Sequence, residues 1–525
     1  MTIVAVAAVL AFQQTALTAP LPRVGGTLVL ATDEDADRLD PNLSGQRAST
    51  IVYTQIFEPL ILRDPKDKAF KPWLATSWQA SPDGKTYTFR LRQDVKFHDG
   101  TPFNAAAVKF NFDRTHNPAL STRCVGCALG FYDSAEVVDP FTVRVHLKSP
   151  WAPFLDALTT AYLMVSPTAV AKAGDRDFGR QPVGSGPFRF VEWIPNDRIV
   201  LERNPDYTWS PAVFTHRGKA YLDRVIYKVI PEPSSRVAAL ETGEVQLVRI
   251  VSSEDFQRLV KDARYAPVVG LLPGVPWTWA INTTKFPTSE LAVRQALNLG
   301  IDREIIAKAV FRAFQAYGAF RPAYTLYSPV SWAYDKSAEP YSFDRARASS
   351  LLDGAGWRAG PDGIREKAGQ RLEIYLVSWE HGVPELMQAQ LRRIGISLRV
   401  GILDTLSVNA AQRRGESHMG AVPASRTDPD ILSLLLHSRN VGGGFNFSFV
   451  KDPELDRLLD QGAIETNLAQ RRQFYVRAAR LAMERAYMLP VHTRDNIGLA
   501  STRVQGLRFD AAGLFPMLHD VWLAP

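Results

Sequence analysis

Two pairs of aspartates have a spacing that could support acid–base chemistry, Asp33 with Asp35 and Asp428 with Asp430. A carboxylate pair can supply the general acid and base of a glycoside hydrolase. Aspartates more commonly cap helices or remain solvated at the surface. The chain lacks the His-Glu-x-x-His pattern of zinc proteases, and Gly184-Ser185-Gly186 does not have the spacing of a hydrolase nucleophile. No catalytic residues are therefore predicted.

A glycine pattern from Gly174 to Gln181 begins like a phosphate-binding loop. It continues with Arg180-Gln181, where a nucleotide-binding loop needs Lys followed by Ser or Thr. Without that lysine and hydroxyl, the phosphates and their magnesium ion lack ligands. We expect neither ATP binding nor any other cofactor.

Two cysteines, Cys124 and Cys127, are the only ones in the chain. In an oxidising compartment this spacing favours a short-loop disulfide that fixes a turn. A redox-active pair is an alternative, although no thioredoxin-like pattern surrounds it. A zinc site would need two further ligands, for which His116 and His146 are the nearby candidates. We predict the disulfide and no metal site.

The length and composition describe an ordinary globular protein. The 525 residues include 46% hydrophobic and 22% charged residues, which excludes wholesale disorder. Such a length predicts roughly three or four domains. The net charge of +7 is mild and its basic residues are interspersed with acids, so no nucleic-acid partner is expected.

The first residues predict an exported protein. Residues 3–12 form an apolar run that is too short for a membrane span of about 20 helical residues. Small residues follow up to Ala19, so residues 1–19 are predicted to be a signal peptide. No lysine or arginine precedes the run, and no cysteine lies near the expected cleavage point. We expect a soluble periplasmic protein without a lipid anchor.

Strands and helices alternate along the chain, which predicts a mixed α/β fold. A hairpin is expected from Thr86 to Phe97 because apolar and polar residues alternate there and Asp-Gly turns flank it. Further strands are expected at residues 26–31, 143–147, 188–193, 198–202, 225–230 and 245–250. Helices are expected at residues 288–305, 384–394, 453–459 and 467–488. The last helix should bury Phe474, Val476, Ala479 and Leu481.

An ordered set of motifs resembles the solute-binding proteins of ABC importers, family 5, the peptide, nickel and opine type. It includes Trp78–Phe89, Val95–Phe103, Gly184-Ser-Gly-Pro-Phe188 and Asn204-Pro-Asp-Tyr-Thr-Trp209. It continues with Asn282–Lys285, Val293–Leu297, Ile301–Arg303, Gln390–Ile396 and Asp428-Pro429. Many of these residues build turns or core, so they identify the fold more than the ligand.

The resemblance implies a two-lobed periplasmic binding protein fold, type II and cluster C, with an extra inserted subdomain. Domain I is then discontinuous and comprises residues 20–48, 187–272 and 489–525. Residues 49–186 form domain II, the inserted subdomain, and residues 273–488 form domain III, the second lobe. A small solute or peptide would bind between the lobes of a monomer, which would deliver it to an inner-membrane permease.

The ligand is where this chain departs from the family pattern. Peptide binders of the family hold the ligand's α-ammonium with an aspartate three residues before the Asp-Pro pair, and that position is Ser425 here. A hydroxyl cannot replace a carboxylate, and Arg426 adds positive charge. An anionic, sugar-like or modified ligand is therefore favoured over a free-amine dipeptide, unless Asp428 or Asp430 binds the ammonium instead. The expected ligand contacts are Tyr53, Trp277, Trp279, Asn282, Trp379, Ser425, Arg426, Asp428 and Asn446.

Two other functions remain as alternatives from the sequence. One is a secreted hydrolase that uses the Asp428 and Asp430 pair. The other is a sensor or chaperone-like binder on the same scaffold. Neighbouring genes for a permease and an ATPase would separate the sensor from an importer.

Overall fold

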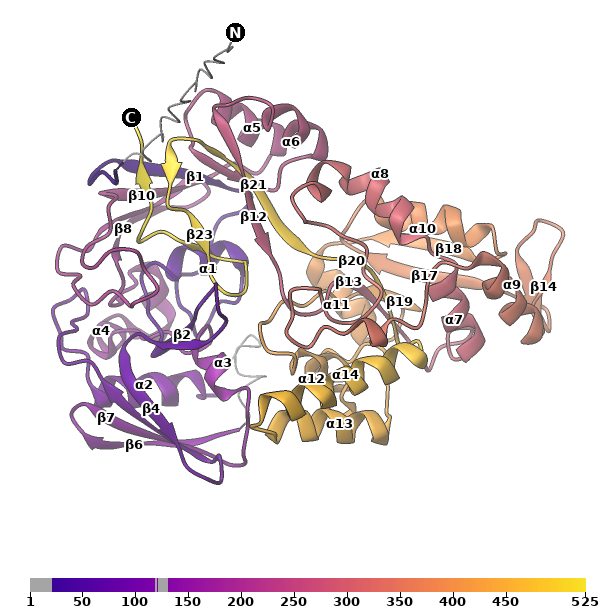
Figure 1. The fold of residues 1–525 in the computed structure, drawn as a ribbon, viewed down its shortest axis with the longest axis horizontal. Coiled ribbons are helices and arrows are strands. Elements are labelled where there is room, and N and C mark those ends of the chain that lie inside the picture. Colours follow the sequence, from indigo (N-terminus) through magenta and orange to yellow (C-terminus); the bar gives the residue numbers. More distant parts are fainter. Residues whose placement is uncertain (1–20, 119, 121–130) are drawn as a thin grey trace, which may run out of the picture.

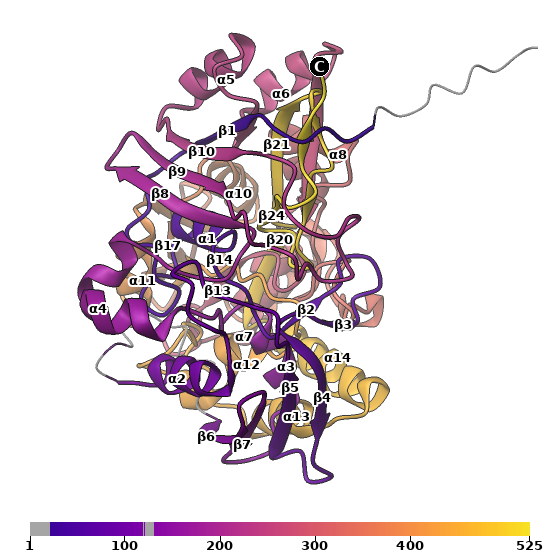
Figure 2. The same cartoon turned by 90° about the vertical axis from the view of Figure 1, so that its left-hand side faces the viewer.

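The computed structural model describes residues 21–118, 120 and 131–525. The predicted signal peptide and the predicted Cys124–Cys127 disulfide lie outside the described residues. The described chain forms two lobes (Figure 1). One carries the N-terminal segment and the C-terminal end, and the other carries the middle of the chain. Figure 2 shows the first lobe turned toward the viewer.

A seven-stranded mixed sheet organises the first lobe, in the order β12-β21-β11-β1-β10-β9-β8. The central strand β1 pairs in parallel with β10 and β11, and the other neighbours are antiparallel. Leu28 and Leu30 of β1 are buried in the core of this lobe. The strands are β1 (Thr27–Thr32), β8 (Phe188–Ile194), β9 (Arg198–Arg203), β10 (Arg224–Val229), β11 (Leu247–Arg249), β12 (Tyr265–Leu271) and β21 (Asp495–Ser501).

A four-stranded antiparallel sheet forms the lower part of the same lobe (Figure 1). Its strands are β4 (Ala75–Ala80), β5 (Thr86–Leu91), β7 (Thr142–Leu147) and β6 (Tyr132–Asp139), in that order. The predicted hairpin from Thr86 to Phe97 is wrong, because β5 pairs with β4 and β7. Asp83 accepts hydrogen bonds from Ser81 and Lys85, which closes the turn before β5.

A five-stranded sheet, in the order β18-β17-β19-β13-β20, organises the second lobe. Residues 489–525 were predicted to belong to domain I, but β20 pairs with β13 in this sheet. The predicted division at 488/489 is therefore too early, and the chain returns to the first sheet only after His492. The strands are β13 (Trp277–Ile281), β17 (Glu373–Ser378), β18 (Ser397–Ile402), β19 (Met419–Ala421) and β20 (Met488–His492).

Fourteen named helices cover these sheets in the described part of the chain. In the first lobe they are α1 (Arg47–Tyr53), α2 (Ala105–Thr115), α3 (Phe154–Leu158), α4 (Pro167–Asp177), α5 (Pro233–Glu241) and α6 (Ser253–Leu259). In the second lobe they are α7 (Leu291–Leu299), α8 (Arg303–Gln315), α9 (Arg345–Gly354), α10 (Val383–Arg392), α11 (Thr405–Arg413), α12 (Ile431–Leu436), α13 (Pro453–Ile464) and α14 (Leu468–Glu484). No helix of the described ranges is long and apolar enough to cross a membrane.

The remaining strands form short ribbons. They are β2 (Ile61–Arg63) with β3 (Phe70–Pro72), β22 (Val504–Gln505) with β25 (Trp522–Leu523), β23 (Arg508–Phe509) with β24 (Pro516–Met517), and the set β14 (Arg358–Ala359), β15 (Arg365–Lys367) and β16 (Gln370–Arg371).

The predicted helix starts at Asp452-Pro453 and Asn467 are confirmed, since Asp452 and Asn467 cap α13 and α14 through their side chains. The predicted inward face of α14 is confirmed in full only at Ala479, since Phe474, Val476 and Leu481 are partly buried. The buried residues of α14 also include Arg471 and Tyr475. Arg471 faces inward because a buried carboxylate, Asp428, binds it there.

A buried glutamate, Glu58, gathers residues from several of the sequence motifs. Its carboxylate accepts hydrogen bonds from Trp73 Nε1 (2.7 Å), Ser185 Oγ (2.7 Å), Tyr207 Oη (2.6 Å) and Trp209 Nε1 (2.9 Å). All four donors are neutral, and burial raises the pKa of Glu58 to about 7. The motifs around Ser185 and Trp209 therefore meet at one acid in the first lobe.

The glycines around Ser185 allow the chain to approach closely enough for this contact. A Cβ atom at Gly184 would lie 2.1 Å from the carbonyl oxygen of Ile56. The Gly186 amide donates to the same carbonyl at 2.8 Å. Only glycine fits at position 184, because the neighbouring atoms belong to backbone.

We predict that Glu58→Gln flattens the pH dependence of folding stability. Because the folded pKa of Glu58 is raised, its neutral form stabilises the fold below its unfolded pKa of about 4.5, and this contribution is lost as the pH rises through about 7. The wild type should lose up to about 3 kcal/mol of unfolding free energy relative to the variant across this window. Chemical denaturation between pH 4.5 and 8 measures the difference.

Glu244→Gln is the matched control for this experiment. Glu244 pairs with Lys228 at the surface and has a half-exposed side chain. Its variant should keep the wild-type pH profile. An unchanged profile for Glu58→Gln would show that Glu58 is ionised throughout this range.

Candidate functional site

A cavity of about 820 Å³ lies between the two lobes. The first lobe lines it through residues on or near α1 and α3 and through the segment 512–515, including Gln46, Tyr53, Trp151, Asp156, Thr160 and Phe515. The second lobe lines it through α11, the segment 425–431 and the loop after α12, including Asn409, Arg413, Ser425, Arg426, Thr427 and Asp428. Both lobes therefore contribute polar side chains to one cavity.

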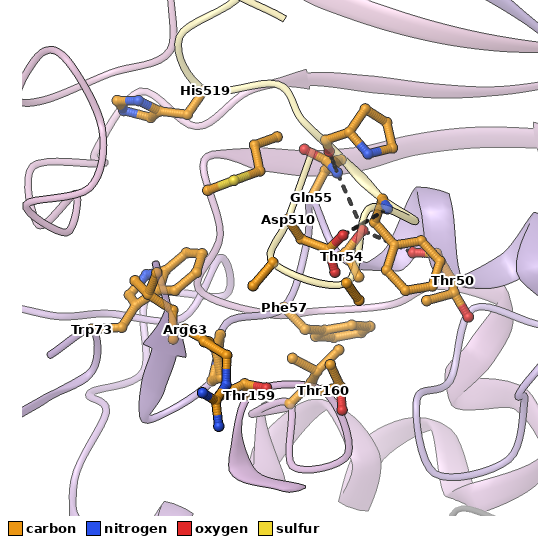
Figure 3. Close-up of a pocket in the computed structure, with 18 of the residues that line it drawn as sticks. Thr50, Thr54, Gln55, Phe57, Arg63, Trp73, Thr159, Thr160, Asp510 and His519 are labelled. Atoms are coloured by element: carbon orange, nitrogen blue, oxygen red, sulfur yellow. Dashed lines mark hydrogen bonds between the residues drawn. The ribbon is translucent and has the colours of Figure 1, made fainter. Parts of the chain in front are cut away.

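A smaller cavity of about 110 Å³ adjoins the large one, and the two share Thr160, Thr427, Ala512 and Phe515. Figure 3 shows Asp510 opposite Thr159 and Thr160, with Trp73 and Arg63 to one side. The Asp510 carboxylate accepts from the amides of Leu514 and Phe515, and burial raises its pKa to about 6. The small cavity extends the site into the first lobe.

The wall segment 424–426 is held against the chain that crosses between the sheets. The Val275 amide donates to the Ala424 carbonyl at 2.7 Å, and Ser425 Oγ donates to the Pro273 carbonyl at 3.0 Å. Gly274 has φ +99°, and a Cβ atom there would lie 2.6 Å from the carbonyl oxygen of Ala424. Glycine at this position lets the two segments touch, which fixes the backbone of Ser425 and Arg426.

Asp428 forms a buried ion pair with Arg471 of α14. Both carboxylate oxygens accept from the guanidinium at 2.7 Å, and both side chains are nearly inaccessible to solvent. Arg471 Nε also donates to the Gly462 carbonyl. Asp428 thus anchors the cavity wall to the helices of the second lobe.

Asp430 lies beside this pair and has no cation of its own among the described residues. It accepts hydrogen bonds from Ser433 Oγ (2.6 Å) and Tyr475 Oη (3.0 Å). Burial, followed by the neighbouring charge of Asp428, raises the pKa of Asp430 to about 6. The two aspartates are occupied by structural contacts and do not form a free acid–base pair.

A side-chain hydrogen bond joins the two lobes at the cavity. Thr427 Oγ1 of the second lobe donates to Asp156 Oδ1 of α3 in the first. Asp156 also accepts from Arg63 Nε at 2.8 Å. Burial raises the pKa of Asp156, and the charge of Arg63 partly opposes this shift. A backbone bond from the Ala152 amide to the Ala463 carbonyl, 2.8 Å long, adds a second link.

Four of the predicted ligand contacts line the large cavity. They are Tyr53, Ser425, Arg426 and Asp428. The phenol of Tyr53 is engaged with Thr50 and with the Ser44 carbonyl, so its hydroxyl already has protein partners. Their role in ligand binding stays a prediction.

The other five predicted contacts do not line either cavity described above. Trp279 is fully buried, and Asn446 donates to the carbonyls of Leu436, His437 and Val450. Asn282 caps the backbone turn at Thr284. Trp277 packs edge-on against Trp379 with ring centroids 5.5 Å apart. These contacts give each residue a place in the packing of the second lobe.

Several cavity residues were not predicted from the sequence. Trp151, Asp156, Thr427 and Arg413 all line the cavity, but none stands in a motif with recognisable chemistry. Thr427 adjoins residues that were predicted, so the Asp428-Pro429 pair was the one available signal. Trp151 and Asp156 come from a segment that folding alone brings opposite the second lobe.

Among the described residues, His216, His519 and Asp520 form the one group that could hold a metal ion. Their candidate ligand atoms lie within 4.8 Å of one another. Each imidazole Nε2 is 2.7 Å from a backbone carbonyl, and Asp520 accepts from Arg508 and from the Thr215 amide. All three residues have protein partners, and the group is separate from the large cavity.

Comparison with known proteins gives consistent matches over the chain. Residues 69–443 match the model for "Bacterial extracellular solute-binding proteins, family 5 Middle". The glutathione-binding protein GsiB of Salmonella typhi is 31% identical over 507 residues, covering 93% of this chain and 94% of that protein.

Solved structures also match this chain over most of its length. NikA from Brucella suis, in complex with Fe(III)-EDTA, has a TM-score of 0.84 and 30% identity, covering 95% of this chain and all of that one. DppA from Helicobacter pylori, in complex with the peptide STSA, has a TM-score of 0.79 and 26% identity, covering 96% and 99%.

The fold and the cavity between its lobes define a solute-binding protein of the ABC-transporter type. The chain belongs to the bacterial extracellular solute-binding proteins, family 5, as its motifs predicted. Members of this family are transport binding proteins and not enzymes. The hydrolase hypothesis is therefore wrong, in agreement with the structural contacts of Asp428 and Asp430.

We predict that Asp428→Asn lowers the unfolding free energy by about 3–5 kcal/mol, because it leaves the Arg471 guanidinium buried without an anion. Asp335→Asn is the matched control, since Asp335 pairs with the next arginine, Arg472, at a partly exposed position. The control should cost less than about 1 kcal/mol. Urea denaturation measures both values, and equal losses would contradict a structural role for the buried pair.

Proposed function

We propose that this protein is the periplasmic capture subunit of an ABC importer. It binds a peptide or peptide-like solute between its lobes and delivers it to an inner-membrane permease. The observation that carries this proposal is the 820 Å³ cavity lined by polar residues of both lobes. Its size falls within the range of about 300–1,000 Å³ that is usual for small-molecule sites.

The similar proteins support this class of ligand. Their names and titles give glutathione for the Salmonella typhi relative and the peptide STSA for the Helicobacter pylori protein. AgaA from A. tumefaciens R10, in complex with agropinic acid, has a TM-score of 0.77 and 25% identity, covering 95% of this chain and 99% of that one. A peptide or amino-acid derivative is the chemistry that these ligands share.

The mechanism that we propose is closure of the lobes over the solute. A ligand shifts the protein toward a closed state only through contacts that the open state does not offer. A solute that touches Trp151 and Arg426 at once contacts both lobes. The permease would then distinguish the closed, loaded form from the open one.

We expect glutathione or the peptide Ser-Thr-Ser-Ala to raise the melting temperature and to reduce the radius of gyration. A ligand at 100 times its Kd stabilises the folded state by about 2.7 kcal/mol, which corresponds to a shift of a few degrees. Differential scanning fluorimetry and small-angle X-ray scattering measure the two effects. ATP, the control, should change neither value. The proposal fails if peptides, opines and saccharides all leave both values unchanged.

We predict that Thr427→Val weakens the binding of every ligand by several-fold, because it removes the side-chain hydrogen bond between the lobes that the closed state gains. Calorimetric titration with the same peptides measures this loss. Thr502→Val is the control. It removes a hydroxyl that donates to the Arg264 carbonyl and does not line the cavity, so this variant should bind as the wild type does. An unchanged affinity for Thr427→Val would show that this hydrogen bond does not contribute to closure.

A further inference from the structure

The acids of the large cavity are already occupied by protein donors. The carboxylates that line it in the described structure belong to Asp156, Asp428 and Asp430. Arg63 and Thr427 bind the first, Arg471 binds the second, and Ser433 and Tyr475 bind the third. These acids are therefore poorly placed to receive the ammonium group of a ligand.

The positively charged side chains of the same cavity, by contrast, have no acidic partner in the described structure. Arg413, at the end of α11, and Arg426 both line it. Neither forms an ion pair or hydrogen bond within the described residues, and Arg413 only lies 6.0 Å above the ring of Phe447. Each guanidinium carries five N–H donors in a fixed planar arrangement that fits a carboxylate. Both therefore remain available to a solute.

A third donor without a partner comes from the other lobe. Trp151 lines the cavity and is 4% exposed, and its buried indole Nε1 has no acceptor among the described residues. A buried N–H group without an acceptor is costly, and a ligand oxygen can relieve that cost. Donors without a protein partner therefore lie on both sides of the cleft.

Two further arginines add positive charge near the cavity residue Leu514, although Asp33 and Asp510 act on Arg249 in the opposite direction. Arg249 binds the neutral Asn496 side chain, which in turn bonds to the carbonyl of the cavity residue Leu514. Arg494 forms no ion pair or hydrogen bond within the described residues, although Glu380 lies within electrostatic reach. Burial lowers the pKa of Arg249 to about 9 and that of Arg494 to about 10. A nearby anion would stabilise both charged forms.

We propose that the captured solute carries a carboxylate, which Arg426 and Arg413 bind from the second lobe while Trp151 donates to the same end of the solute from the first. This inference rests on the proposed function, because it names the chemical class of the captured solute. The backbone contacts at Ala424 and Ser425 hold Arg426 in place before the solute arrives. A carboxylate shared by the two lobes gains its full set of donors only when the lobes are closed.

Calorimetric titration of the full chain with three forms of one peptide tests the charge requirement. The probes are acetyl-Ser-Thr-Ser-Ala with a free carboxylate, Ser-Thr-Ser-Ala-amide with a free amine, and the doubly blocked peptide. The acid should bind at least about tenfold more tightly than the other two. Equal binding of the amide overturns the inference and leaves the proposed function intact. Absence of binding by all three and by glutathione overturns both.

Charge-neutral variants identify the residues responsible. Arg426→Gln and Arg413→Gln should each weaken binding of the acid by about tenfold and leave binding of the amide unchanged. Arg414→Gln is the matched control, because Arg414 adjoins Arg413 but pairs with Glu416 and does not line the cavity. Unchanged binding of the acid by both cavity variants would overturn the assignment.

Two further measurements distinguish charge recognition from misfolding. The ligand-free melting temperatures of Arg413→Gln and Arg426→Gln should equal that of the wild type, since neither guanidinium makes an internal ion pair. Arg426→Glu should reverse the preference and bind the free-amine amide more tightly than the acid. A variant that loses both probes equally would indicate a damaged cavity and would count against the proposal.

Discussion

The whole second lobe is inserted between two neighbouring strands of the first sheet, and this connection determines how the two lobes can move relative to each other. The chain leaves the seven-stranded sheet after β12 and returns at β21, which pairs directly with β12. Asp495 binds both crossings, since it accepts from the Leu272 amide on one and from Thr493 Oγ1 on the other. A connection of two adjacent segments permits rotation of rigid lobes far more easily than bending within either sheet. The cavity between the lobes is therefore the natural place for a ligand to act on shape.

The motifs that identify the family lie mostly in the scaffold that makes such rigid lobes. Ser185, Tyr207 and Trp209 all donate to Glu58, far along the chain from them. A buried carboxylate with four neutral donors needs every donor in place, which explains why separate motifs occur together. The cavity itself is lined mainly by residues outside these motifs. Family membership and ligand identity thus rest on different residues of the same chain.

Sequence patterns predicted strands well where one face is buried, as in β1, β7, β9 and β10. These patterns failed where strand pairing or a buried charge determined the structure. The Thr86–Phe97 hairpin was wrong because β5 pairs with β4, which precedes it in the sequence, and with β7, which follows it. The inward face of α14 was predicted only in part, because Arg471 is also buried there against Asp428, which no hydrophobic pattern can indicate. The cavity was predicted in part, through Ser425, Arg426 and Asp428, since they flank a recognisable Asp-Pro pair. Trp151 and Asp156 were missed because only the tertiary fold brings them opposite that segment.

The contacts between the lobes explain why solute charge can control closure. At the cavity a hydroxyl–carboxylate contact and a backbone hydrogen bond join the lobes, and Ala463 of the second lobe packs into the core of the first. Each such bond contributes only about 0.5–1.5 kcal/mol, or somewhat more where one partner is charged. Hydrogen bonds of this size add only a few kcal/mol to the free energy of closure. A solute adds most to closure where the cavity offers donors that its own acids leave unused. In the proposed mode of binding, the internal pairing of Asp156 and Asp428 matters because it leaves the charges of Arg413 and Arg426 for the ligand.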